Sequence, residues 1–443
     1  MYLVEQFAKF AVDFRQVPMT PEVMHHARRA VIDWYAAVLP GSVLPPATLL
    51  EKALAEELGR GPARLVRGAP ATTRLAALVN GTASHIVEVD DIFREAIYHP
   101  GAPTIAAALA LAQARNVSGA DFLRAVVVGY EISTRIGAAM GRAHYKHWHN
   151  TGTIGCFGAA AAAAEILGLD QQKFAHALAT VATFAAGLQQ AFRMDSMSKP
   201  LHAGRAAEAG VTAALACAEG VTGSLDILEG AAGLGRAMSD GPDWAKAVET
   251  LGREFHITRI TFKNHACCGH TFAPIDGALA LQAQYGIEPA DIEQVSISTY
   301  KAALEVAGYD TPATPAEARF SVKYTVATAL VHGSVRLAAF EPDRLGDSVT
   351  RALMKKIVLS VDPELDAAFP GQRAAKVSIR MRDGRVFTHL QPTRKGDPEA
   401  PLTDVELEQK YLELAEPVLG QAAAGALLAK LKTLDTLPTL ATL

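Results

Sequence analysis

The chain is poor in cysteine, with four in 443 residues. These are Cys156, Cys217, Cys267 and Cys268; two are adjacent, and none belongs to a CxxC pair. The spacing argues against a disulfide framework and against a zinc or iron–sulfur centre. One way to dehydrate a hydroxy acid uses an iron–sulfur cluster as its Lewis acid. In this chain, side chains would have to carry out such a reaction, and we expect no cofactor and no metal.

Charge is also scarce, since charged residues make up 20% of the chain and the net charge is −4. This balance offers no basic surface for nucleic acid. No apolar run reaches the roughly 18 to 20 residues that a membrane span requires. Residues 1–16 form an amphipathic pattern with acidic residues and no cleavage signature, which is typical of an ordinary helix. We expect a cytoplasmic protein that binds neither nucleic acid nor membrane.

Helical periodicity dominates the first 260 residues. One predicted helix begins at Pro21 after a Thr cap. Further helices are predicted at 70–88, 102–115, 119–141, 155–168, 171–192, 203–219 and 243–252. The glycine-rich stretch at 219–241 is expected to form loops around one short helix.

The period changes after about residue 265. Alternating apolar residues at 295–299 predict a half-buried strand, and 377–390 predicts a hairpin around Asp383-Gly384. Capping boxes predict helices at 315–332 and 404–416. The fold class is therefore mainly α, a large all-helical domain plus a smaller α+β lid domain. We place the helical domain at 1–262, completed by 396–443, and the lid at 263–395.

The stretch at 84–112 carries the strongest functional signal. An acidic cluster, Glu88, Asp90 and Asp91, leads into His99, which precedes a proline and a small-residue helix. Proline disfavours the α conformation of the residue before it, so His99 is expected in an extended loop. A titratable ring beside a helix N-terminus suits a carboxylate ligand. Glu88 lies between two valines, and partial burial would raise its pKa and fit it for acid or base catalysis.

Two further segments repeat this arrangement. His149 precedes an alanine-rich helix, and Lys199 and His202 precede the helix that begins near Arg205. Small residues allow helices to approach closely, so the three helix starts are predicted to converge on one anion-binding pocket. Loop capping and solvent exposure are the alternative interpretations of each residue.

Two other groups of reactive residues have weaker interpretations. His144, His147 and His149 are closely spaced, but no carboxylate or cysteine neighbour completes a metal-ligand set. In the segment 263–270, Cys268 would need His265 or His270 as an activating base to act as a nucleophile. A polar interdomain hinge is the alternative for that segment.

Taken together, these segments resemble the MmgE/PrpD family of 2-methylcitrate dehydratases and cis-aconitate decarboxylases. The motifs that carry the resemblance are VDD…HPGAP (89–103), HNTGTIGCFGAAAAAAEILGLD (149–170), KPLHAGRAAEAG (199–210), KNHACCGHTFAPIDG (263–277) and ARFSVKY (318–324). They span nearly the whole chain in the family's order. The resemblance implies a helical domain, an α+β lid, a cleft between them and a homodimer. It also implies cofactor-free chemistry on small di- or tricarboxylates.

The resemblance also implies roles for individual residues. The expected catalytic residues are His99, His149, Glu88, Lys199, Lys263 and Tyr324. Substrate-binding residues are expected at Asp90, Asp91, His202, Cys268, His270 and Arg205. Three positions depart from the family pattern: Glu88 stands where Asp is usual, Ile92 where Thr is common, and Cys268 where decarboxylases carry His. The changes at Ile92 and Cys268 count against a strict decarboxylase.

The shared chemical problem is removal of a proton α to a carboxylate, because the resulting anion gains a second negative charge. Cations and fixed N–H donors must stabilise that anion, and a base and an acid must move the protons. His99 and His149 are predicted for the last two roles, in either order. A hydro-lyase on a citrate-like acid is the first hypothesis. An epimerase or decarboxylase on a related dicarboxylate is the second, and a non-catalytic carboxylate-binding protein is the third.

Overall fold

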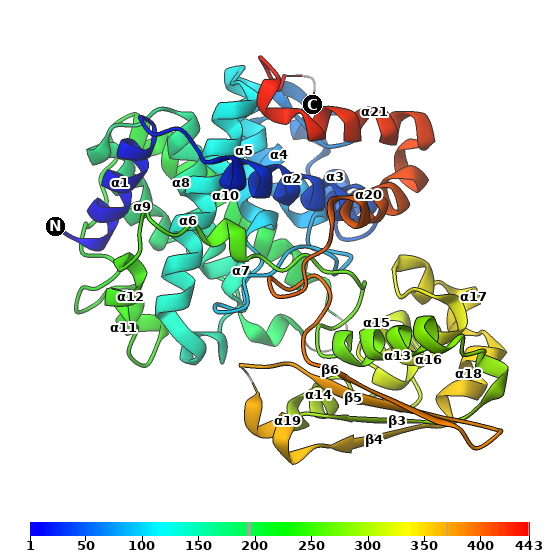
Figure 1. Cartoon of the computed structure of the whole chain (residues 1–443). Helices are drawn as coiled ribbons and strands as arrows, with labels where there is room; N and C mark the ends of the chain where they lie inside the picture. Colours follow the sequence, from blue (N-terminus) through cyan, green and yellow to red (C-terminus); the bar gives the residue numbers. More distant parts are fainter. Residues whose placement is uncertain (193–195, 370, 442) are drawn as a thin grey trace. The chain divides into compact units, whose positions relative to one another are not determined.

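The computed structural model describes residues 1–192, 196–369, 371–441 and 443. The chain divides into two compact units (Figure 1). The helical unit comprises Met1–Thr261 and Thr403–Leu443, and the α+β unit comprises Phe262–Leu402. Helices dominate and strands are few, which confirms the predicted mainly α fold class.

The border between the two units lies a few residues beyond the sequence-based one at 395/396. Residues 396–402 belong to the α+β unit. There the Phe262 N–H donates to the Gly396 carbonyl (3.0 Å), and the buried Arg394 guanidinium pairs with Asp397 (2.8 Å). These contacts hold the return segment against the start of the same unit.

The helical unit is built from helices and one irregular hairpin. Its helices are α1 (Leu3–Phe14), α2 (Pro21–Gly41), α3 (Ala47–Ala53), α4 (Thr73–Ala83), α5 (Gly101–Arg115), α6 (Gly119–Tyr145), α7 (Asn150–Thr153), α8 (Gly155–Ile166), α9 (Gln171–Ala182), α10 (Ser198–Ala218), α11 (Leu234–Met238), α12 (Trp244–Val248), α20 (Asp404–Leu419) and α21 (Gln421–Lys432). Strands β1 (Leu58–Arg64) and β2 (Pro70–Ala71) form the hairpin. The C-terminal α20, dark orange in Figure 1, packs on α2, so the end of the chain returns to the helical unit as expected.

The centre of the helical unit consists of small residues. Helices α5 and α8 are buried along almost their whole length, and both contact α10 (Figure 1). A Cβ on Gly158 would lie 2.4 Å from Thr104 Oγ1, and one on Gly204 would lie 2.1 Å from Thr82 Oγ1. Such contacts are too short for any larger residue. The glycines therefore allow α8 to pack closely on α5 and α10 to pack closely on α4.

The α+β unit has one mixed sheet of four strands in the order β4-β3-β5-β6. The strands are β3 (Ile292–Thr299), β4 (Ile357–Val361), β5 (Ala375–Met381) and β6 (Val386–Gln391). Its helices are α13 (Phe272–Tyr285), α14 (Lys301–Val306), α15 (Pro315–Arg319), α16 (Val322–His332), α17 (Pro342–Leu345), α18 (Ser348–Met354) and α19 (Pro363–Ala368). Strand β3 runs parallel to β4 and antiparallel to β5, and α13 packs on β5 and β6. The predicted strand and hairpin are confirmed, whereas β4 was not predicted.

Several predicted helices are shorter than expected. The helix predicted at 171–192 ends at Ala182; in the segment that follows, Gly187 adopts φ +135° and its carbonyl accepts the His149 N–H (2.9 Å). The helix predicted at 315–332 is two helices, since the Ser321 side chain caps the second one. The helix predicted at 70–88 ends at Ala83. In the described part of the chain, no helix combines the length and apolar character that crossing a bilayer demands.

Candidate active site

The segment between α4 and α5 leaves the helical path and brings its acidic residues inward. Asp91 is buried; its Oδ1 accepts the Gly101 N–H at the start of α5 (3.0 Å), and its Oδ2 accepts the Tyr130 hydroxyl (2.7 Å). Burial, with the charge of Asp33, raises the pKa of Asp91 to about 8. The carboxyl group of Asp91 therefore occupies this helix N-terminus, where the sequence analysis expected a substrate carboxylate. Its contacts hold the loop that carries His99, and its expected contact with substrate stays a prediction.

Asp90 lies between two histidines. Its Oδ2 is 2.7 Å from His85 Nδ1 and 3.2 Å from His99 Nδ1, and its side chain is 2% exposed. Burial by itself raises the pKa of Asp90, but His99 and His85 outweigh it and hold that pKa well below its usual range. A carboxylate can only accept hydrogen bonds, so His85 Nδ1 is the donor in its contact with Asp90. His99 Nδ1 approaches the same oxygen at ion-pair distance without forming a hydrogen bond, and the His99 side chain is 13% exposed.

Further imidazoles stack beside this pair. The rings of His85 and His149 are nearly parallel, with centroids 5.3 Å apart at 17°, and those of His85 and His99 meet edge to face at 4.9 Å. His149 Nδ1 lies 3.0 Å from His202 Nδ1. Burial lowers the pKa of His149 well below its usual value and that of His85 to about 4. We call His85, Asp90, His99, His149 and His202 the histidine cluster.

A cation stands beside the cluster. Lys199, near the start of α10, forms an ion pair with Glu88, and its Nζ lies 5.1 Å from the centroid of the Phe192 ring. Glu88 has φ +60°, a conformation that costs energy in a residue other than glycine and often marks a functional segment. The Lys199 charge also contributes to lowering the pKa of His149.

The three segments singled out in the sequence therefore meet, as predicted. His99 comes from the loop before α5, and His149 from the start of α7. Lys199 and His202 lie within α10, which begins at Ser198; the prediction that they precede a helix starting near Arg205 was wrong. His202 also lines a hollow of about 580 Å³ together with Gly187 and other residues of the 186–198 stretch. Arg205 lines the same hollow but is exposed and paired with Glu208, so its predicted substrate contact remains a prediction.

Comparison with known proteins places this geometry in a family. The MmgE/PrpD N-terminal domain matches residues 5–247, and the MmgE/PrpD C-terminal domain matches residues 265–435. The chain belongs to the MmgE/PrpD family. The predicted family membership is confirmed.

Characterised relatives of this MmgE/PrpD chain carry lyase names. The cis-aconitate decarboxylase-like protein oryM of Aspergillus oryzae is 27% identical, over 94% of this chain and 90% of its own length. Human cis-aconitate decarboxylase is 28% identical over 82% of this chain and 76% of its own. The 2-methylcitrate dehydratase of Salmonella typhimurium is 31% identical over 27% of this chain and 26% of its own. The expectation that the chain is an enzyme of the lyase type is confirmed.

The remaining predicted residues of this MmgE/PrpD chain lie in the α+β unit. Lys263 is buried, and the backbone N–H of Cys268 donates to the Arg319 carbonyl (3.0 Å). His270 Nδ1 is 2.8 Å from the Tyr300 hydroxyl, and burial lowers its pKa to about 3. The buried hydroxyl of Tyr324 donates to the Ala339 carbonyl. The structure describes these residues within their own unit, and their roles stay predictions.

His85 is the residue of the cluster that the sequence analysis missed. It lies five positions before Asp90 in a segment that was already singled out, but the predicted helix at 70–88 included it. Because α4 ends at Ala83, the chain turns and faces the His85 ring toward Asp90. A histidine close to an acidic pair at a helix end was the available signal.

The same residues include the one group of possible metal ligands found in the described part of the chain. One ligand atom from each of His85, Asp90 and His99 lies within 4.8 Å of the others. Within this group, His85 Nδ1 and Asp90 Oδ2 form a hydrogen bond of 2.7 Å. Both ring nitrogens of His144 have hydrogen-bond partners, Thr153 Oγ1 (2.7 Å) and the Met238 carbonyl (3.0 Å). His144 therefore does not join His147 and His149 in a set of metal ligands.

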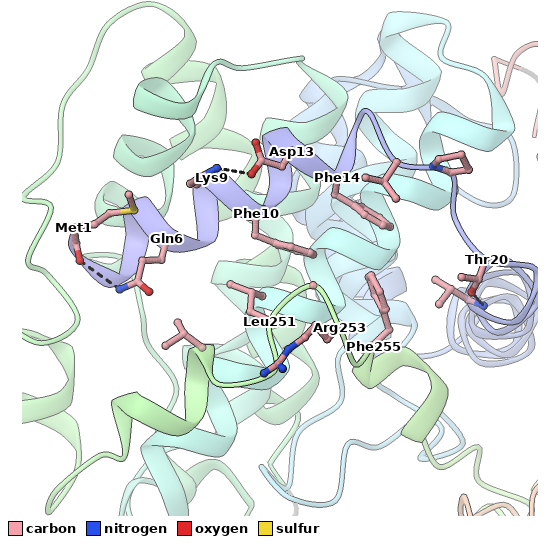
Figure 2. Close-up of a pocket in the computed structure, with 15 residues that line it drawn as sticks. Met1, Gln6, Lys9, Phe10, Asp13, Phe14, Thr20, Leu251, Arg253 and Phe255 are labelled. Carbon is pink, nitrogen blue, oxygen red and sulfur yellow. Dashed lines mark hydrogen bonds and ion pairs between the residues drawn. The ribbon is translucent and has the colours of Figure 1, made fainter.

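A separate cavity of about 640 Å³ in the helical unit has a different character (Figure 2). Phe10 and Phe14 of α1 face Leu251 and Phe255 across it. Its charged side chains, those of Lys9, Asp13 and Arg253, are exposed, and Lys9 pairs with Asp13. It offers no buried titratable group, so the histidine cluster is the candidate active site.

Proposed function

We propose that this chain is a cofactor-independent hydro-lyase that dehydrates a small citrate-like di- or tricarboxylate. The observation that carries this proposal is Asp90 held between His85 and His99 beside the cation of Lys199. A carboxylate-paired imidazole is suited to taking a proton, and a nearby lysine is suited to holding the carboxylate next to the reacting carbon.

We assign the base role to His99. Its Nδ1 faces Asp90, and it is partly exposed, so its Nε2 is the atom that can accept the proton from carbon. Asp90 stabilises the imidazolium that forms, as the aspartate of a serine-protease triad does. The C–H electron pair becomes the new C=C bond.

We assign the acid role to His149. Burial keeps its ring neutral, and a neutral imidazole can donate a proton to a developing oxyanion. In the dehydration, His149 protonates the departing hydroxyl, so that water leaves as the C=C bond forms. The protons on the two rings are then reset by exchange with solvent.

Lys199 is proposed to bind a substrate carboxylate in exchange for Glu88. Both side chains of that pair are about one-fifth exposed, so an incoming anion can compete for the lysine. His202 and Arg205 extend the same side of the cluster. The proposal also includes, through the family resemblance, catalytic roles for Lys263 and Tyr324, substrate contacts of Cys268 and His270, and a homodimer. It includes a cytoplasmic location on the composition of the chain.

Decarboxylation is the second candidate. The observation that favours it is coverage: the relatives that span most of this chain are named for cis-aconitate decarboxylation. In that reaction the C–C electron pair stays on carbon when CO₂ leaves, and an acid of the cluster protonates that carbon. The same lysine and histidines would serve.

Proton NMR of chelator-treated protein in D₂O tests the proposal. The panel holds 2-methylcitrate, citrate, cis-aconitate and substituted succinates. A new alkene signal from a hydroxy acid supports dehydration, and loss of a carboxylate supports decarboxylation. His147→Asn is the matched control for His99→Asn, because His147 is an exposed histidine outside the cluster. No change with any substrate, beside an active control enzyme, would overturn the proposal.

A further inference from the structure

His85 occupies the centre of the histidine cluster without being exposed. It follows the C-terminus of α4, its side chain is fully buried, and its ring contacts those of both His99 and His149. Its Nδ1 donates to Asp90 Oδ2 at 2.7 Å. One ring therefore contacts both histidines that we propose as catalytic, one through a shared carboxylate and one by stacking.

The ring is held in one protonation state and one tautomer. Asp90 accepts hydrogen bonds only, so the neutral ring carries its proton on Nδ1. Nε2 is buried and has no hydrogen-bond partner among the described residues. A buried acceptor without a partner is uncommon and calls for an explanation. Burial, together with the charges of Lys199 and His99, disfavours a proton on Nε2, so this atom stays an unprotonated acceptor.

We propose that His85 is a positioning residue that fixes both catalytic histidines: His99 through Asp90, and His149 through ring stacking. This inference rests on the proposed function. It adds a third histidine whose task is orientation rather than proton transfer. The hydrogen bond keeps Asp90 ionised and turned toward His99, and the flat face of the ring sets the plane of His149.

Two substitutions separate these two contacts. His85→Phe keeps an aromatic ring against His149 but removes the donor to Asp90. His85→Asn keeps an N–H near the position of Nδ1 but removes the ring. We expect kcat of His85→Phe to fall about 10- to 100-fold with little change in KM, as for other residues that orient a catalytic group.

The pH profile provides a readout that a purely structural role would not move. The charged and titratable groups facing His85 are Asp90, His99, His149 and Lys199, with Asp33 and Asp91 behind Asp90. In His85→Phe, Asp90 loses its hydrogen-bond donor, and its less stabilised charge holds a proton on the Asp90–His99 pair more tightly. The corresponding limb of the kcat/KM profile should move to higher pH, and His85→Asn should restore it.

An NMR measurement tests His85 without reference to turnover. In wild-type protein labelled with ¹⁵N at histidine, the His85 ring is expected as the neutral Nδ1–H tautomer from pH 5 to 8. A ring that titrates in this range, or an Nε2–H tautomer, would overturn the inference even in an inactive protein. In an active protein, a His85→Phe variant with wild-type kcat and pH profile would also overturn it. If no carboxylate is turned over while the tautomer is as expected, the proposed function fails and the positioning geometry stands.

Discussion

Two histidine-containing segments, 84–101 in the helical unit and 262–271 in the α+β unit, differ in how their histidines are paired. In the first, His85 and His99 share one carboxylate, Asp90. In the second, each histidine has a partner of its own: His265 pairs with Asp276 (2.9 Å), and His270 contacts the Tyr300 hydroxyl. A shared carboxylate couples the protonation of two rings, whereas separate partners do not.

The hydrogen bonds of the two carboxylates, Asp276 and Asp90, indicate which segment is suited to proton transfer. Asp276 also accepts the backbone N–H of Lys395 (2.7 Å), so its carboxylate ties a loop together. Asp90 Oδ1, in contrast, is buried without a hydrogen-bond partner in the described residues. A carboxylate with spare acceptor capacity next to a partly exposed histidine fits a catalytic role, and a fully satisfied one fits a structural role.

The largest expected effect comes from converting Asp90 to its amide. Asp90→Asn removes the charge that stabilises a protonated His99 and presents an N–H where a carboxylate oxygen accepted. We expect kcat to fall about 10³- to 10⁴-fold, as when the aspartate of a catalytic triad becomes asparagine, with a thermal melt showing a folded protein. Asp276→Asn should change kcat less than about tenfold. Equal losses of kcat in Asp90→Asn and Asp276→Asn would contradict the assignment of a catalytic role to Asp90 and a structural role to Asp276.

A buried ion pair supports each unit, and only one of them reaches the histidine cluster. Lys410 of α20 contacts Asp33 (2.6 Å) and the Val89 carbonyl (2.7 Å), next to Asp90. Removing one partner of a buried pair costs about 3–5 kcal/mol, so Lys410→Met should lower the free energy of unfolding by that amount, measured with urea.

The matched variant in the α+β unit is Arg394→Met, because Arg394 pairs with Asp397 at similar burial. Both variants should be destabilised, but only Lys410→Met should also lower kcat in the folded protein, since it releases the backbone beside Asp90. An unchanged kcat in Lys410→Met would show that the Lys410–Asp33 ion pair does not influence catalysis.

The local signals in the sequence predicted much of this arrangement. The caps at Thr314 and Thr403 are formed as expected, and the convergence of His99, His149 and Lys199 followed from small residues at the helix starts. The His85–Asp90 contact was not predicted, because the helix predicted at 70–88 included His85, whereas α4 ends at Ala83. Likewise, the hydrogen bond between His149 and Gly187 was not predicted, because Gly187 was placed in a helix that ends at Ala182. Helical periodicity reports which residues are buried, but not where a helix ends or which distant residues then meet.

A smaller effect is expected from the cation beside the cluster. Lys199→Ala removes one charge-assisted contact with a substrate carboxylate, worth about 1.5–3 kcal/mol, or roughly a 10- to 100-fold rise in KM. Glu88→Gln should act in the opposite direction on KM, because it frees Lys199 from its ion pair. Steady-state kinetics on the substrate found by NMR distinguish these outcomes. A fall in kcat with unchanged KM in Glu88→Gln would instead assign the carboxylate a direct role in catalysis.

The smallest effect concerns stability against pH. His85 and His270 both have folded-state pKa values lowered by burial, to about 4 and about 3. The unfolded chain takes up these protons near pH 6.5, and the folded chain only at lower pH, so the unfolded state binds more protons in between. Stability is therefore fully present above about pH 6.5 and decreases as the pH falls toward 4. Urea unfolding at pH 7.0, 5.5 and 4.5 measures this slope. His85→Phe and His270→Phe should each reduce it, and a slope unchanged in both would show that other groups set the acid sensitivity of the two units.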